Sequence, residues 1–159
     1  MIHNLFQPTF KVNWADLDAN HHMRNTAYLD YAAQARFLFL NSNGFTPADF
    51  SAERIGPVVF SDEITYENEL RFLEEFSVDL KLGGISEDGS KFVFLNNFIN
   101  LGGKLCATVK TKAAWFDLQS RKLRPPPARL KKVLEQMDKS EDFHIRQQET
   151  ADASERRIK

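Results

Sequence analysis

The segment WADLDANHHMRN, residues 14–25, concentrates side chains capable of acid–base chemistry into one short, turn-like stretch. Its polar members are two carboxylates, two carboxamides and two adjacent imidazoles: Asp16, Asp18, Asn20, Asn25, His21 and His22. Carboxylates and imidazoles are common general bases in enzymes, and a carboxylate can also attack as a nucleophile. The segment is therefore the candidate active site.

A nearly apolar segment follows directly, at residues 26–41, and it contains neither Gly nor Pro. Its few polar side chains are Asp30, Gln34 and Arg36. A helix that is apolar almost all round must be surrounded by other structure, and Asn43-Gly44 is typical of a helix C-terminus. We therefore expect a long buried helix that begins at the candidate site, where Asn25 either caps the helix or contacts a substrate.

The rest of the chain is typical of strands. Residues 9–14 alternate apolar and polar side chains, which predicts a short strand before the helix. Hairpin turn signals at Asp88-Gly89 and Gly102-Gly103 separate runs rich in β-branched and aromatic residues. These runs predict four further strands: 58–70, 75–85, 91–101 and 104–118. Strand, long helix and then four strands is an α+β layout in a single domain.

Shorter elements complete the expected domain. Thr46 and Pro47 are suited to the cap and first position of a short second helix. The prolines at 125–127 interrupt the chain before an amphipathic helix at 128–139. We expect one domain over residues 1–138 and a polar, flexible tail over 139–159.

Composition limits the classes of function. The chain has 21 basic and 22 acidic residues and a net charge of -1, whereas a nucleic-acid binder normally shows a basic excess. The basic run 121–124 fits a solvated turn. Cys106 is the single cysteine and is expected to be a buried, inert thiol. With no signal peptide and no long apolar span in the sequence, we expect no membrane span and a cytoplasmic protein.

The motif D-L-D-A-N-H-H-M-R-N followed by T-A-Y-L-D-Y-A resembles the signature of hotdog-fold thioesterases. It is most similar to the acyl-CoA and acyl-ACP branch related to 4-hydroxybenzoyl-CoA thioesterase. The matching positions are Asp16, Asp18, Asn20, His22, Asn25, Tyr28 and Leu29. The resemblance covers about residues 8–125 and implies an antiparallel sheet wrapped around the central helix. It also implies a homodimer or homotetramer with sites between subunits, and no cofactor beyond the coenzyme A or acyl carrier of the substrate.

The chain departs from the family signature at two positions. His21 replaces a glycine, which permits a tight backbone approach, and Arg24 replaces the first asparagine of an Asn-Asn pair. Arg24 could place a positive charge near an acyl carboxylate or a coenzyme A phosphate. A salt bridge from Arg24 to Asp16 or Asp30 is the simpler expectation.

Thioester hydrolysis requires an activated water or nucleophile and a donor for the developing oxyanion. The N-terminus of a helix offers unpaired N–H groups and positive potential, so it can polarise the thioester carbonyl. Asp18 can then act as general base or as a nucleophile that forms an anhydride. By resemblance, Asn20 and His22 orient substrate or water, or His22 shares the base role.

Other candidates have simpler explanations beside the functional ones. Tyr28 is a possible substrate contact, although packing is the simpler role for a residue on a buried helix. Glu63 lies at period-two spacing with Glu67 and Glu69 and is a candidate second carboxylate; a solvated charge is the alternative. His21 is a possible substrate contact, as is Arg24.

The motif allows three interpretations other than thioester hydrolysis. A metal site is disfavoured because adjacent side chains in an extended segment point to opposite faces and no third ligand is near in sequence. A hotdog hydratase or dehydratase would carry a different histidine and acid arrangement, which the sequence does not contain. A non-catalytic acyl-thioester binding module on the same fold stays open because of His21 and Arg24.

Overall fold

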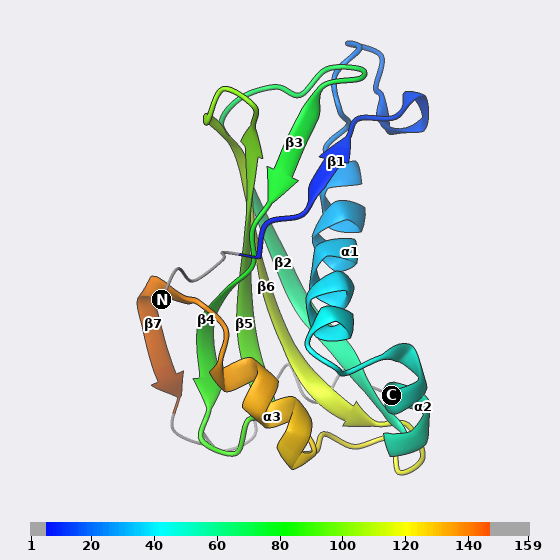
Figure 1. The fold of residues 1–159 in the computed structure, drawn as a ribbon, viewed down its shortest axis with the longest axis vertical. Coiled ribbons are helices and arrows are strands. Elements are labelled where there is room, and N and C mark those ends of the chain that lie inside the picture. The colour runs from blue at the N-terminus through cyan, green and yellow to red at the C-terminus, as the bar shows by residue number, and fades with distance from the viewer. Residues whose placement is uncertain (1–5, 147–159) are drawn as a thin grey trace.

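A curved seven-stranded sheet wraps one long helix, α1 (Ala27–Ser42), in the computed structural model, which describes residues 6–146 (Figure 1). The strands are β1 (Thr9–Lys11), β2 (Ile55–Tyr66), β3 (Glu75–Val78), β4 (Lys81–Ser86), β5 (Lys91–Asn100), β6 (Leu105–Asp117) and β7 (Lys139–Arg146). The shorter helices are the 3-10 turn η1 (Trp14–Asp16), α2 (Pro47–Glu53) and α3 (Ala128–Glu135). The predicted α+β class, with a sheet around a central helix, is confirmed.

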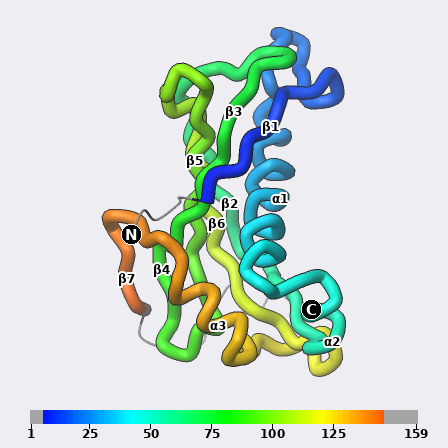
Figure 2. The backbone as a smooth tube through the Cα atoms, in the orientation of Figure 1, coloured from blue at the N-terminus to red at the C-terminus, as the bar shows by residue number. Residues whose placement is uncertain are grey.

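The sheet is centred on β5. On one side β5 pairs antiparallel with β6, which in turn pairs with β2. On the other side β5 pairs with β3 and then with β4. The tube in Figure 2 shows how β1 extends the sheet beside β3 and how β7 extends it beside β4. Among the described residues, the outer edge of β2 has no strand partner.

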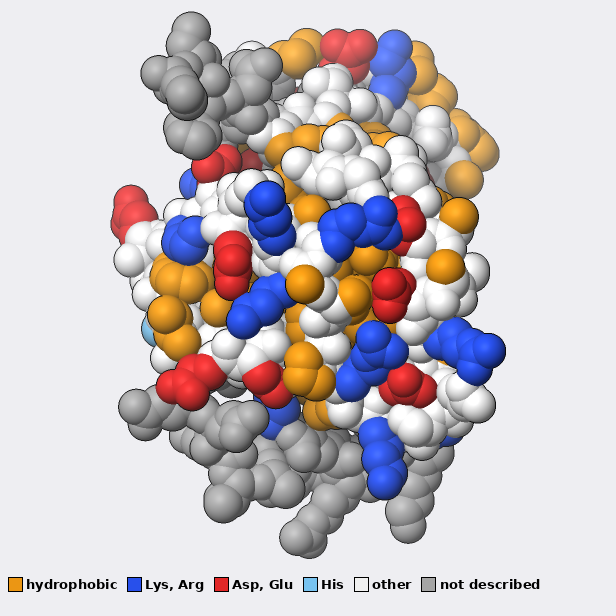
Figure 3. Space-filling view, turned by 60° about the horizontal axis from the view of Figure 1, so that its bottom comes forward, with side chains coloured by type: hydrophobic (Ala, Val, Ile, Leu, Met, Phe, Trp, Pro, Cys, Tyr) orange, Lys and Arg blue, Asp and Glu red, His pale blue; other side chains and the backbone are white. Residues whose placement is uncertain are grey.

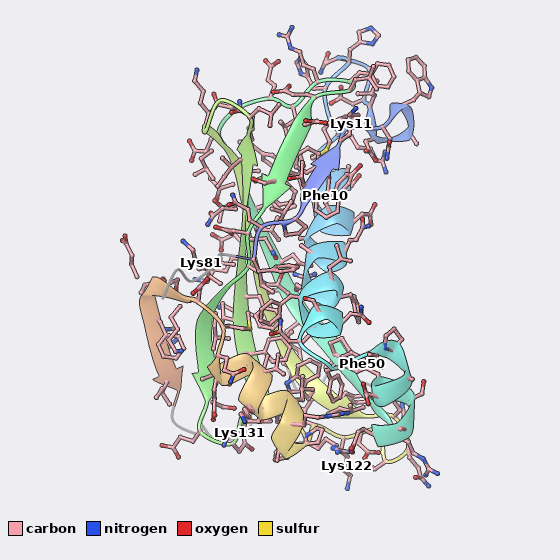
Figure 4. All side chains as sticks on the ribbon, viewed as in Figure 1. Phe10, Lys11, Phe50, Lys81, Lys122 and Lys131 are labelled. Carbon is pink, nitrogen blue, oxygen red and sulfur yellow. The ribbon has the colours of Figure 1, made fainter. Side chains whose placement is uncertain are left out.

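Helix α1 buries its apolar side chains in two separate clusters beneath the sheet. The upper cluster includes Tyr28 and Tyr31 and packs on Phe76 and Phe98. Phe10 of β1 joins it with its ring 5.2 Å from that of Tyr31, between the strand and the helix (Figure 4). The N-terminal half of α1, which begins at the candidate site, is therefore fixed by aromatic packing.

The lower cluster joins the C-terminal half of α1 to α2 and α3. Phe39 and Leu40 of α1 pack there with Trp115 and with the buried residues of α3. Phe50 of α2 contacts both Phe45, at 4.7 Å between ring centroids, and Trp115, at 6.1 Å (Figure 4). Helix α2 begins at the predicted cap, because the Thr46 hydroxyl accepts a hydrogen bond from the Asp49 N–H.

Several element boundaries differ from the sequence predictions. The strand predicted at 75–85 is two strands, separated at Asp79, whose carboxylate accepts hydrogen bonds from the backbone and side-chain amide of Asn97. The first strand ends at Lys11, because the chain turns into η1, and the terminal helix ends at Glu135. The polar tail predicted from 139 onward begins instead with β7, while residues 147–159 lie outside the described part.

The end of the molecule that carries α2 and α3 has acidic and basic side chains interspersed (Figure 3). The basic run at 121–124 lies among these mixed charges. Arg124 forms ion pairs with Asp117 and Glu53, and the guanidinium of Arg121 lies over the ring of Phe116. Cys106 is buried, and burial raises the pKa of its thiol. Within residues 6–146, no helix is both long and apolar enough to cross a membrane.

Candidate active site

Asp18 organises the loop that leads into α1. Its Oδ1 accepts hydrogen bonds from the backbone N–H of Asn20, at 2.8 Å, and of His22, at 3.3 Å. Its own N–H donates to the His22 carbonyl at 2.9 Å. Oδ2 has no protein partner among the described residues. One carboxylate oxygen is thus used to hold the loop, and the other is available to a ligand or water.

His21 occupies a left-handed backbone conformation, with φ of 62°. The family signature has glycine at this position, and the structure explains why, since a non-glycine residue in this region costs about 1–2 kcal/mol. The turn closes all the same, because the His21 N–H donates to the Asp18 carbonyl at 3.1 Å. The histidine therefore keeps the glycine-like turn, and its side chain is exposed.

The loop is fastened to the segment after β2. The Met23 N–H donates to the Leu70 carbonyl at 2.7 Å, and His22 forms an isolated β-bridge with Arg71. This pairing brings His22 Nε2 to 2.7 Å from Glu69 Oε2. A carboxylate at this distance orients the imidazole ring.

Neighbouring groups fix the backbone at the start of α1 and leave its first N–H groups without protein acceptors. Thr26 is the N-cap, one residue later than the predicted Asn25, and its side chain does not cap the helix. The Tyr66 hydroxyl donates to the Asn25 carbonyl at 2.9 Å. Within the described residues, the N–H groups of Asn25 and Thr26 have no protein acceptor. These donors at a helix N-terminus are available to an oxyanion.

A cavity of about 660 Å³ opens at this end of the molecule. It brings together four of the predicted site residues: Asp18, His22, Asn25 and Tyr28. Most of its lining residues carry a polar group, and Met23 is the one aliphatic residue among them. The structure thus gathers a carboxylate, an imidazole and the start of α1 around one solvent-accessible space.

The other four predicted site residues do not line this cavity. Glu63 is exposed on β2, opposite Lys110 of β6. Asn20 and His21 are exposed on the loop. Arg24 donates to the Ala15 carbonyl and to the Thr26 hydroxyl, so the salt bridge expected with Asp16 or Asp30 is absent among the described residues.

Sequence reasoning missed the carboxylate that contacts the loop. Glu69 was placed with Glu63 by period-two spacing, but β2 ends at Tyr66 and the alternation ends with it. The contact between Glu69 and His22 follows from the backbone pairing of His22 with Arg71, 49 positions away, for which the local sequence has no signal. Glu74 and Tyr66 also enter the cavity wall in this way.

Tyr28 is 3 % exposed and lines the cavity, and its hydroxyl has no protein partner among the described residues. Burial, with smaller effects of Cys106 and Tyr66, raises the pKa of Tyr28 to about 12. A phenol with this pKa stays protonated at neutral pH. Tyr28 is thus a hydrogen-bond donor available to a bound molecule.

The raised pKa of Tyr28 predicts a specific loss of stability in alkali. The folded protein holds this proton more tightly than the unfolded chain, whose value is 10.0. The resulting stabilisation is complete below pH 10 and is lost as the pH rises toward 12. Denaturant unfolding from pH 8 to 11.5 should show a larger fall for wild type than for Tyr28→Phe. A difference between the two proteins that does not vary with pH would contradict this assignment.

No group of three or more His, Cys, Asp or Glu side chains within residues 6–146 is arranged to hold a metal ion. The polar groups present are those of an acid–base site: a carboxylate, an imidazole paired with a second carboxylate, and backbone donors at a helix end.

The chain matches the model of the thioesterase-like superfamily over residues 12–134. A sequence search of curated proteins finds no match. Among solved structures, a hypothetical protein from Staphylococcus aureus in complex with CoA superposes with a TM-score of 0.77 at 20% identity, covering 85% of this chain and 84% of that one.

Two further structures share the fold. A 1,4-dihydroxy-2-naphthoyl-CoA thioesterase from Synechocystis has a TM-score of 0.74 at 16% identity, covering 84% of this chain and 97% of its own. A putative oleoyl thioesterase from Lactobacillus plantarum has a TM-score of 0.78 at 12% identity, covering 93% and 54%. The resemblance inferred from the motif is thereby confirmed: the chain belongs to the thioesterase-like superfamily and has the hotdog fold.

Proposed function

We propose that this protein hydrolyses acyl thioesters of coenzyme A to a free acid and a free thiol, with Asp18 as the residue that activates the attack. The observation that carries the proposal is the position of Asp18 in the wall of the cavity at the N-terminus of α1. Its Oδ1 is fixed by two backbone N–H groups while Oδ2 is available. Membership of the thioesterase-like superfamily supports the same chemistry.

Asp18 can act by either of two routes. As general base, Oδ2 takes a proton from a water whose oxygen adds to the thioester carbonyl carbon. The tetrahedral intermediate then collapses, the C–S bond breaks, and the thiolate leaves and is protonated. As nucleophile, Oδ2 attacks the carbonyl carbon itself, expels the thiolate and forms an anhydride that water hydrolyses.

The start of α1 stabilises the oxyanion in both routes. Asn25 lines the cavity, and its N–H has no protein acceptor among the described residues. One preorganised donor of this kind contributes roughly 3 kcal/mol to the transition state, or about a hundredfold in rate. The hydrogen bond from Tyr66 to the Asn25 carbonyl keeps this backbone from rotating.

His22 and Asn20 assist Asp18 in different ways. His22, held by its contact with Glu69, can act as general acid and give a proton to the departing thiolate. Asn20 acts through its backbone N–H, which orients the Asp18 carboxylate. The side chain of Asn20 is exposed and does not line the cavity.

Free-thiol release from a panel of aliphatic and aromatic acyl-CoAs, and from acyl-ACP, tests the proposal. We expect hydrolysis of at least one CoA thioester by the wild-type protein. Hydration of crotonyl-CoA without thiol release would identify a hydratase instead. Saturable binding of acyl-CoA with no turnover of any thioester would identify a binding module.

The site is expected to be completed by a second copy of the chain. The outer edge of β2 has no strand partner in the described part, and large apolar side chains are exposed beside it: Phe37 (47 %), Leu38 (40 %) and Val59 (47 %). An unprotected edge of 12 residues is a ready template for pairing. A homodimer, or a tetramer built from it, would cover these groups.

Light scattering coupled to size exclusion should therefore give at least twice the mass of the chain at micromolar concentration. A monomer across the accessible concentration range would contradict this prediction. It would also leave the exposed surface beside β2 without an explanation.

A further inference from the structure

Four polar residues meet near the middle of α1, and we call them the polar seam: the half-buried Arg36 of α1, the buried Thr111 and Asn96 of the sheet, and the exposed Asp62 on the edge strand β2. The Thr111 hydroxyl accepts from Arg36 Nη1 at 2.8 Å and donates to Asp62 Oδ1 at 2.5 Å. Asp62 lies opposite Thr111 in the pairing of β2 with β6. The seam lies where the two apolar clusters of the core are interrupted.

Much of the hydrogen-bonding capacity of the seam is unused. Asn96 is fully buried, and while its Nδ2 donates to the Asp79 carbonyl, its Oδ1 has no partner. A guanidinium has five N–H donors, and the described residues accept from one of those of Arg36. Burial lowers the pKa of Arg36, an effect that Asp62 partly opposes. Since buried polar groups are normally hydrogen-bonded, the free Asn96 oxygen and the free N–H groups of the half-buried Arg36 are available to a bound molecule.

A half-buried apolar strip connects the active site to the seam. Leu29 and Ala33 follow the start of α1 at helical spacing, and Arg36 lies one turn further along the same face. Ile64 and Phe60 of β2 are half-buried on the neighbouring strand. Leu29 and Ile64 both pack against the upper core cluster. An acyl chain laid along this strip would have its carbonyl at the helix N-terminus and its far end at Arg36.

We propose that the polar seam binds a carboxylate at the distal end of the acyl group, so that the substrate is an ω-carboxyacyl-CoA. This inference rests on the proposed thioesterase function and names its substrate class. The guanidinium of Arg36 pairs with the carboxylate, a geometry to which its planar fork is suited. Thr111 accepts one N–H of the guanidinium and is itself held by Asp62, and the other N–H groups of Arg36 have no acceptor among the described residues.

The position of Arg36 sets the expected length of the acyl group. Ten residues separate Thr26 from Arg36, which is roughly 15 Å along a helix, and the arginine side chain shortens the gap because helical side chains lean toward the N-terminus. An extended chain rises ~3.3 Å per three bonds in a strand. A span of roughly 10–15 Å therefore corresponds to about 9 to 14 carbons.

The test compares straight-chain acyl-CoAs with their ω-carboxy counterparts, from about six to about sixteen carbons, by free-thiol release. We expect wild type to prefer the ω-carboxy thioester at intermediate length, with the preference seen in KM. Arg36→Met should lower kcat/KM for that thioester by about tenfold or more and change that for the plain acyl-CoA by less than about threefold. Arg36→Lys should retain part of the preference, since it retains the charge.

Lys112→Met is the matched control, because Lys112 is next to Thr111 but is exposed on the other face of β6, and it should change neither substrate. If Arg36→Met fails to fold, Thr111→Val tests the same point by releasing the guanidinium from its hydroxyl acceptor. Active wild type without any preference for the carboxylate would overturn the inference and leave the thioesterase proposal intact. A loss of oligomeric mass in Arg36→Met, with acyl preference unchanged, would also overturn it and assign Arg36 to a subunit contact. No thiol release from any thioester would instead overturn the proposed function.

Discussion

Asp18→Asn is expected to lower kcat for acyl-CoA hydrolysis by about a thousandfold, within the range that a general base or nucleophile contributes. This substitution can change catalysis without disturbing the fold. The carboxamide oxygen can still accept the N–H groups of Asn20 and His22, so the turn before α1 is retained. What is lost is the proton acceptor or nucleophile at Oδ2. We therefore expect kcat to fall while KM and thermal stability change little.

Asp30→Asn supplies the control for this experiment. Asp30 is an exposed carboxylate in the first turn of α1, so its removal changes the local charge by the same amount without touching the cavity. Stopped-flow detection of free thiol by both variants and wild type gives the comparison. Wild-type turnover by Asp18→Asn would rule out Asp18 as base and as nucleophile.

The fold was largely predictable because its strongest signals are local. Helix α1 was expected at 26–41 and runs from 27 to 42, since a run without Gly or Pro and with almost no polar side chains has few other states open to it. The turns around Gly89 and Gly103 adopt the positive φ that their sequences indicate.

Elements that depend on distant partners were not predictable. The break between β3 and β4 is set by Asp79, whose carboxylate binds Asn97 from the neighbouring strand. Strand β7 has a polar sequence, KSEDFHIR, and owes its conformation to parallel pairing with the exposed edge of β4. Neither contact leaves a trace in the periodicity of its own segment.

The candidate site divides in the same way. Asp18, Asn25 and Tyr28 reach the cavity because they belong to one turn and the helix that it starts, a unit visible in the sequence. The sequence predicts a salt bridge for Arg24, but its guanidinium donates instead to the Ala15 carbonyl and the Thr26 hydroxyl. Glu69 was grouped with Glu63, and its contact with His22 depends on a backbone bridge between two loops.

A second large effect on turnover is expected at His22, which contacts Glu69. His22→Gln is expected to lower kcat by about a hundredfold, or about 2.7 kcal/mol in the barrier, because glutamine can occupy the space and donate to Glu69 but cannot transfer a proton. Steady-state thiol release measures the loss. His21→Gln, on the exposed neighbouring histidine, is the matched control and should leave kcat near that of wild type.

The role of Glu69 can be separated from that of His22 by a double-mutant cycle. In the wild type Glu69 Oε2 lies 2.7 Å from the imidazole, and Glu69→Gln keeps a side chain of the same size there but removes its charge. We expect kcat to fall about tenfold in the wild-type background, less than for His22 itself because Glu69 acts through the imidazole. In the His22→Gln background the same change should have almost no effect, since residues that act as a unit are non-additive. If the two substitutions instead lower kcat by independent factors that multiply in the double variant, Glu69 acts on the substrate directly. His22 would then function without the help of Glu69.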